Sequence, residues 1–182
     1  MNTLLNTTTL AFDLVMWLFI LRIVLQLVRA DFYNPLSQLI MKTTRFPTDA
    51  LRHVLPNLRN FNVSAAVVLF AIAVAYVHII SGFGVLGHHA NRWEAMIWAA
   101  MKIATLVTNL YTFTLVVQAI LTWLGPGVSN PASNVLWSMN EPLLRPVRRF
   151  VPPVSNLDVS FIVVIFALRI VNGLIPLHGA LR

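Results

Sequence analysis

The sequence contains no cysteine, which excludes disulfides, thiolate metal sites and cysteine nucleophiles. Charge is also scarce, because Asp, Glu, Lys and Arg make up 10% of the residues, against about 25% in an ordinary soluble domain. Acidic residues are the rarer sign, with 6 Asp+Glu against 13 Lys+Arg. So few charges do not make a water-soluble surface. The 58% of hydrophobic residues arrive in long blocks, so the chain is predicted to be an integral membrane protein.

Catalytic and metal-binding patterns are missing as well. The 5 histidines do not recur at the spacing of a zinc site, and there is no Gly-x-Ser-x-Gly motif or Ser-His-Asp arrangement. We therefore expect no enzymatic activity, no metal and no cofactor. The net charge of +7 does not indicate nucleic acid here, because most basic residues lie in two loops beside apolar segments. Membrane topology and anionic lipid headgroups explain that placement more simply.

Four stretches are long and apolar enough to cross a bilayer, which takes about 20 helical residues. They run from about 4 to 28, 63 to 86, 95 to 124 and 159 to 177. The predicted fold is thus an all-α membrane protein with four transmembrane helices. The loops at 29–62 and 125–158 then share one side of the membrane.

Loop charge predicts the orientation. The loops between helices one and two and between helices three and four carry eight basic residues: Arg29, Lys42, Arg45, Arg52, Arg59, Arg145, Arg148 and Arg149. Three lie toward the other side: Arg92, Lys102 and Arg182. Cytoplasmic loops carry the excess of Lys and Arg. The basic loops are therefore predicted to be cytoplasmic and both termini to lie outside.

The chain repeats itself with a shift of 96 residues (130 against 34). This shift brings Asn34-Pro35 onto Asn130-Pro131, Arg52 onto Arg148, and Asn62 onto Asp158. The first repeat is residues 1–87 and the second 88–182. Each would hold two spans, so both insert in the same orientation, which is the parallel-repeat arrangement.

Both repeated loops have helical spacing of apolar residues after an Asn-Pro pair, followed by a second short segment after an internal proline. We expect amphipathic helices in the membrane interface, with the apolar side in lipid and the basic side toward phosphates or a partner. The predicted lipid- or partner-binding residues are Arg45, Arg52, Arg59, Arg145, Arg148 and Arg149. The simpler alternative is a solvated connector. Asn62 and Asp158 directly precede apolar runs and are predicted to be N-caps.

The second loop carries a characteristic pattern of prolines, basic residues and a cap: Asn130-Pro131, Glu141-Pro142, Pro146-Val147-Arg148-Arg149, Val151-Pro152 and Asp158-Val159-Ser160. With this pattern the chain resembles, over nearly its whole length and in the two-repeat form, the YggT family of bacterial membrane proteins, which includes the YlmG proteins of plastids. The first copy departs from the pattern, because Asn62 replaces the acidic cap and only Arg52 stands for the basic pair. The resemblance implies a four-span protein of the bacterial inner membrane. It also implies links to cell division, osmotic stress or assembly of membrane complexes.

Ionisable residues inside a span are costly and call for a reason. Polar residues recur at equivalent positions of helices one and three, and the predicted polar seam between the repeats consists of Asp13, Arg22, Asn109, Gln118 and Arg169. Within it we expect Asp13 to pair with Arg169, directly or through water or Asn109. Lys102, near a predicted helix end, is expected to reach water. The seam either holds the helices together or forms a narrow ion or proton pathway.

Two functions remain open from the sequence. The first is a non-enzymatic scaffold or assembly factor whose basic loops hold anionic lipid headgroups and a protein partner or another copy of the chain. The second is a small oligomeric ion transporter or channel built on the polar seam.

Overall fold

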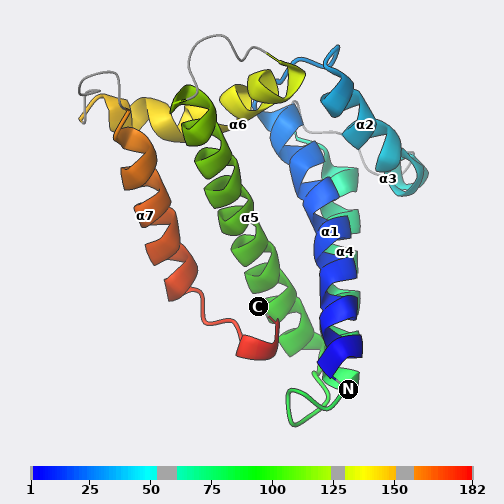
Figure 1. Ribbon diagram of the computed structural model, residues 1–182. Helices are drawn as coiled ribbons and strands as arrows, with labels where there is room; N and C mark the ends of the chain where they lie inside the picture. Colours follow the sequence, from blue (N-terminus) through cyan, green and yellow to red (C-terminus); the bar gives the residue numbers. More distant parts are fainter. Residues whose placement is uncertain (1, 53–60, 124–129, 151–157, 182) are drawn as a thin grey trace.

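The computed structural model describes residues 2–52, 61–123, 130–150 and 158–181 (Figure 1). Within these ranges the chain forms seven α-helices and one short 3-10 helix. Three helices are long and apolar enough to cross a membrane: α1 (Asn2–Leu27), α4 (Val63–Gly82) and α5 (Arg92–Trp123). Their bounds lie within a few residues of the first three predicted spans, and such helices are typical of a multi-pass membrane protein.

The fourth predicted span is shorter than expected. Helix α7 (Ser160–Leu174) is apolar but has 15 residues, or about 22 Å at 1.5 Å per residue, and a bilayer core is about 30 Å thick. The helix ends because Pro176 disfavours helical backbone at the preceding residue. Ile175 is extended, with φ −74° and ψ 114°. The 3-10 helix η1 (Gly179–Leu181) follows.

The main apolar core lies between α1, α4 and α5, which contact one another pairwise. Small residues of α4 and α5 are fully buried in it, including Ala65, Ala73, Ala95 and Ala99. Without large side chains between them the helix backbones approach closely, which is how helices associate in lipid. Helix α7 packs against α5 and α6 over a second, smaller cluster that contains Leu115, Leu144 and Phe161.

The predicted basic loops fold into short helices, and these gather at one end of the long ones (Figure 1). They are α2 (Pro35–Thr43), α3 (Arg45–Arg52) and α6 (Pro131–Arg148). Helix α1 begins at the opposite end, and η1 lies toward that end (Figure 1). Figure 1 also shows α7 running from the end that carries the short helices toward the end at which α1 begins.

The Asn-Pro pairs begin helices, as their sequence predicts. The Asn34 side chain accepts a hydrogen bond from the Leu36 amide, and Pro35 is the first residue of α2. Asn130 accepts from the Ser133 amide, while the Ser133 hydroxyl accepts from the Asn130 amide, which makes a reciprocal capping box at α6. Proline fits here because the first amides of a helix have no acceptor within the helix.

The two loops differ where the sequence predicts the same pair of short segments. In the first loop α2 ends at its C-cap Thr44 and α3 begins at the next residue. Pro47 lies in the first turn of α3, where an N–H has no acceptor within the helix and its absence costs little. In the second loop α6 continues through Pro142 and Pro146. Its apolar residues Val135 and Met139 are buried in the protein core. This side of α6 therefore faces the protein, and the prediction that it faces lipid is wrong.

Of the two predicted N-caps, Asn62 is confirmed, and Asp158 lies one residue before the N-cap position. The Asn62 side chain accepts from the Ala65 amide at 2.9 Å and caps α4. At α7 the N-cap position is Val159, and Asp158 lies one residue earlier. The Asp158 carboxylate nevertheless accepts from the Ser160 amide at 3.0 Å, so it satisfies a first-turn donor of α7.

Candidate functional site

The candidate site is the loop platform, which we define as helices α2, α3 and α6. Helix α2 contacts α1, α3 contacts α4, and α6 contacts both α5 and α7. The platform has two halves, α2 and α3 from the first repeat and α6 from the second, and these halves contact each other. The Asn34 side-chain amide donates to the Pro131 carbonyl at 2.6 Å, so the repeated Asn-Pro pairs of the two copies lie side by side.

Arg22 of α1 anchors the first half of the platform. Its Nη1 donates to the Thr44 hydroxyl at 2.8 Å and to the Met41 carbonyl at 3.2 Å. Arg22 is 8% exposed, so it does not reach water freely. The sequence analysis predicted that Arg22 belongs to the polar seam. In the structure its hydrogen bonds instead hold the α2–α3 junction against α1.

Gln118 and Asn140 form the matching anchor of the second half. The Asn140 side-chain amide donates to Gln118 Oε1 at 2.7 Å, and its oxygen accepts from the Thr114 hydroxyl at 2.9 Å. Gln118 and Asn140 are fully buried. With the shift of 96, Gln118 corresponds to Arg22 and Asn140 to Thr44. Each repeat therefore ties the same loop position to the same position on its first long helix.

Replacing Asn140 by alanine is expected to lower the free energy of unfolding by about 2 kcal/mol, because it leaves the buried Gln118 carbonyl and Thr114 hydroxyl without their shared partner. The measurement is thermal unfolding of the purified protein in nanodiscs. Asn134→Ala is the matched control, since Asn134 is exposed on the same helix and its bonds to Asn130 and to the Ser138 hydroxyl use backbone atoms that alanine keeps. Equal losses in the two variants contradict the anchor.

Arg148 is the most engaged cation of the platform. Its Nε bonds to Asp158 at 2.8 Å and its Nη1 to Glu141 at 2.9 Å. The guanidinium also lies over the rings of Trp137 and Phe161. The sequence grouped Arg148 with the binding residues, but its charge is already balanced within the protein. One signal was present: Glu141 precedes Arg148 by seven residues, which places both on one face of a helix.

The other predicted binding arginines are exposed. Arg145 is exposed on α6 and Arg149 at its C-cap, and Arg52 is exposed at the end of α3. Arg45 is exposed and bonds to Asp49 at 2.8 Å. This hydrogen bond from Arg45 holds the pKa of Asp49 below its usual value, so Asp49 stays ionised at neutral pH. Arg59 lies outside the described residues.

Asp13 does not pair with Arg169 as the sequence analysis expected. Its carboxylate bonds to Lys102 Nζ at 2.8 Å, and Arg169 is exposed on α7. Lys102 is 1% exposed and does not reach water, which also corrects its predicted position. Because α5 begins at Arg92, Lys102 lies ten residues into α5, and Asp13 lies eleven residues into α1. Both groups are thus about 15 Å from the same ends of two helices that run in the same direction.

The remaining polar residues form local contacts, not one continuous seam. Asn172 of α7 donates to the Asn109 side chain at 3.2 Å and to the Thr105 carbonyl at 3.4 Å. In the first repeat the equivalents of Asn172 and Thr105 are Tyr76 and Thr9, and the Tyr76 hydroxyl donates to Thr9 at 3.5 Å. The contact that joins α1 to α4 is thus repeated between α5 and α7. In this part of the chain polar groups serve as interhelical ties.

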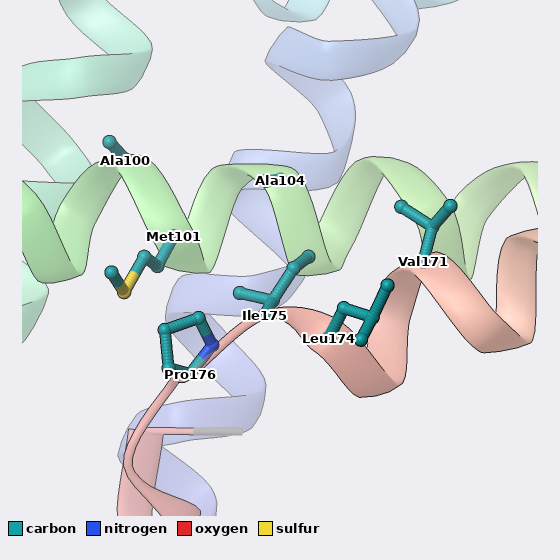
Figure 2. Close-up of a pocket in the computed structure, with 7 residues that line it drawn as sticks. All are labelled: Ala100, Met101, Ala104, Val171, Leu174, Ile175 and Pro176. Atoms are coloured by element: carbon teal, nitrogen blue, oxygen red, sulfur yellow. The ribbon is translucent and has the colours of Figure 1, made fainter.

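A pocket of about 470 Å³ lies between α5 and the end of α7 (Figure 2). Figure 2 shows the lining residues: Ala100, Met101 and Ala104 come from one stretch of α5, and Val171, Leu174, Ile175 and Pro176 from the end of α7 and the residues that follow it. Its lining residues are all apolar and carry no group able to transfer a proton or attack a substrate. The pocket therefore offers no catalytic chemistry.

Comparison with known proteins places the chain in a family. The CCB3/YggT family model matches residues 1–82 and 97–178, so the second match begins and ends 96 residues after the first (97 against 1, 178 against 82). The uncharacterized protein PA0392 of Pseudomonas aeruginosa is 32% identical over 86% of this chain and 79% of its own length. The uncharacterized protein YggT of Escherichia coli is 32% identical over 94% and 88%. No solved structure matches. The two matched segments confirm the repeat that the sequence predicted, and the chain belongs to the CCB3/YggT family in its two-repeat form.

Proposed function

We propose that the chain is a non-enzymatic scaffold of the bacterial inner membrane, whose loop platform docks a protein partner at the cytoplasmic surface. The observation that carries the proposal is the combination of a fixed platform and an open outer face. Anchors such as Arg22–Thr44 and Gln118–Asn140 hold the platform to the long helices. A connector that only links spans has no need of such buried contacts.

The outer face of the platform and its flanks is rich in exposed aromatic and basic side chains. Tyr33 is 91% exposed, Phe46 90% and Phe150 85%, and Arg52 and Arg149 lie among the exposed cations. Aromatic residues and arginine are enriched at protein interfaces because they combine large contact area with directional hydrogen bonds. The same composition suits a surface that rests on anionic headgroups, and the platform is proposed to meet both lipid and partner.

In this proposal the chain crosses the membrane four times. Three helices have the necessary length, and α7 takes the place in the second repeat that α4 takes in the first. The short helix α7 is accommodated by local thinning of the bilayer, which costs a fraction of a kcal/mol per Å. The basic loops then face the cytoplasm by the positive-inside rule, and both termini face outward.

The transporter alternative draws less support from the contacts. It needs a connected polar path, whereas Asp13 bonds to Lys102, Arg22 to Thr44 and Gln118 to Asn140. Each of these bonds leaves the predicted seam for a residue outside it. This pattern favours helix ties, and hence the scaffold.

Photo-crosslinking in intact membranes tests the docking surface. A photoreactive phenylalanine analogue at Phe46 is expected to give a discrete adduct with a partner protein, because this ring stands free on the platform. The same analogue at Phe166, an exposed position on apolar α7, is the matched control and is expected to label lipid. If Phe46 labels only lipid or other copies of this chain, the docking proposal is wrong.

A further inference from the structure

A polar pocket of about 360 Å³ lies where α1 meets α2 and α3. Four cations line it, together with one carboxylate and two neutral side chains: Arg22, Lys42, Arg45, Arg52, Asp49, Gln38 and Met41. Asp49 is bound by Arg45, which leaves three further cations around one cavity. Like charges gathered in this way repel one another unless an anion lies between them.

Arg22 forms the inner wall of this pocket. Its Nη1 is used by Thr44 and Met41, but its Nε is buried and has no hydrogen-bond partner among the described residues. A buried guanidinium donor without an acceptor is costly. Arg22 thus brings to the cavity an unsatisfied cation that is more than nine-tenths buried.

The two repeats differ in how Arg52 and its equivalent arginine are neutralised. At the position of Arg52 the second repeat has Arg148, which is neutralised by Glu141 and Asp158. With the shift of 96, the first repeat has Arg45 in place of Glu141 and Asn62 in place of Asp158. The first repeat therefore has neither carboxylate at the equivalent positions, and one of the two positions holds another cation. Arg52 makes no ion pair with a carboxylate in the described part of the chain.

We propose that the first-repeat pocket binds one phosphate group, held by Arg22, Lys42, Arg45 and Arg52, so that an external anion balances charge that internal carboxylates balance in the second repeat. Arginine forks match the oxygens of a phosphate, and Lys42 adds a compact charge. An anionic phospholipid headgroup and a free phosphate share this chemistry. The inference deepens the proposed function, since it rests on the platform lying at the membrane surface, but it needs no protein partner.

The test uses the full chain in nanodiscs of phosphatidylcholine. One arm titrates inorganic phosphate and reads thermal stabilisation; the other mixes in phosphatidylglycerol and reads retained lipid by native mass spectrometry. Saturable binding of one phosphate group in either arm is expected, and the arm that responds identifies the source. Arg52→Gln and Lys42→Gln, both at exposed positions, are expected to weaken binding roughly tenfold each.

Arg92→Gln is the control, because it removes one exposed cation at the start of α5, away from the platform. It is expected to leave the affinity within about twofold, as an exposed charge outside the pocket acts only through screened attraction. No saturable binding in either arm, or equal weakening by Arg92→Gln and Arg52→Gln, overturns the proposal. Arg22→Gln gives the residue that the second repeat has at this position, and its binding must also fall. A partner adduct from Phe46 without phosphate binding would leave the scaffold standing and remove only this inference.

Discussion

Lys102→Met is expected to lower the free energy of unfolding by about 3 kcal/mol. The variant leaves the Asp13 carboxylate, whose side chain is 22% exposed, without the fully buried cation of Lys102. Breaking a largely buried ion pair from one side is strongly destabilising. Lys102 also lies over the Tyr76 ring, with Nζ 4.9 Å from its centre. The measurement is the midpoint of thermal unfolding in nanodiscs.

The double variant Asp13→Asn/Lys102→Met separates an ion pair from general loss of packing. Removing both charges is expected to recover most of the loss, because neutral groups in the interior avoid the cost of desolvation. Lys42→Met, at an exposed position of α2, is expected to change stability by less than about 0.5 kcal/mol. Additive losses in the double variant would mean that Asp13 and Lys102 do not act as a pair.

Arg148→Gln is expected to cost about 2 kcal/mol, because two carboxylates lose their charge-assisted hydrogen bonds at once. The effect is smaller than a fully buried pair would give, since the Arg148 side chain is 26% exposed and water screens it. Arg148 joins α6 to the residue that leads into α7, so its loss is expected to loosen α7. Thermal unfolding and hydrogen exchange of the α7 amides measure the two effects.

Two matched variants accompany Arg148→Gln. Arg149→Gln removes the neighbouring exposed cation, and Arg52→Gln removes the equivalent cation of the first repeat. Both are expected to leave stability nearly unchanged, because neither side chain forms an ion pair within the described residues. If Arg52→Gln destabilises as much as Arg148→Gln, the two repeats do not differ in the way described.

Most of the fold could be predicted because it follows from patterns that can be read directly along the chain. Hydrophobic length located α1, α4 and α5, Asn62 marked the start of α4, and the 96-residue shift identified the repeat. The end of α7 was missed because Pro176 stops the helix while the apolar run continues to Leu177. Hydropathy reports transfer to lipid, and it does not report where backbone hydrogen bonding ends.

The pairing of charges was harder to predict because it depends on which helix faces meet. Asp13 was matched to Arg169 by depth alone, yet α1 and α5 run in the same direction and Lys102 lies at the same height. Counting residues from the first residue of each helix gives that match. The sequence identified one residue of each anchor, because Arg22 and Gln118 are polar at equivalent positions of the two repeats. It did not identify Thr44 and Asn140, because hydrophobic periodicity does not show where the loop helices pack.

In the proposed topology the platform and the chain termini lie on opposite sides of the membrane, which requires α7 to cross it. The absence of native cysteine makes single-cysteine labelling direct. In spheroplasts, cysteine at Phe46 or Phe150 is expected to react with a membrane-impermeant maleimide only after permeabilisation, and cysteine at Val85 or His178 to react before it. Labelling of Phe150→Cys and His178→Cys from the same side would contradict this topology, because α7 would then not span the membrane and the platform would not be a cytoplasmic surface.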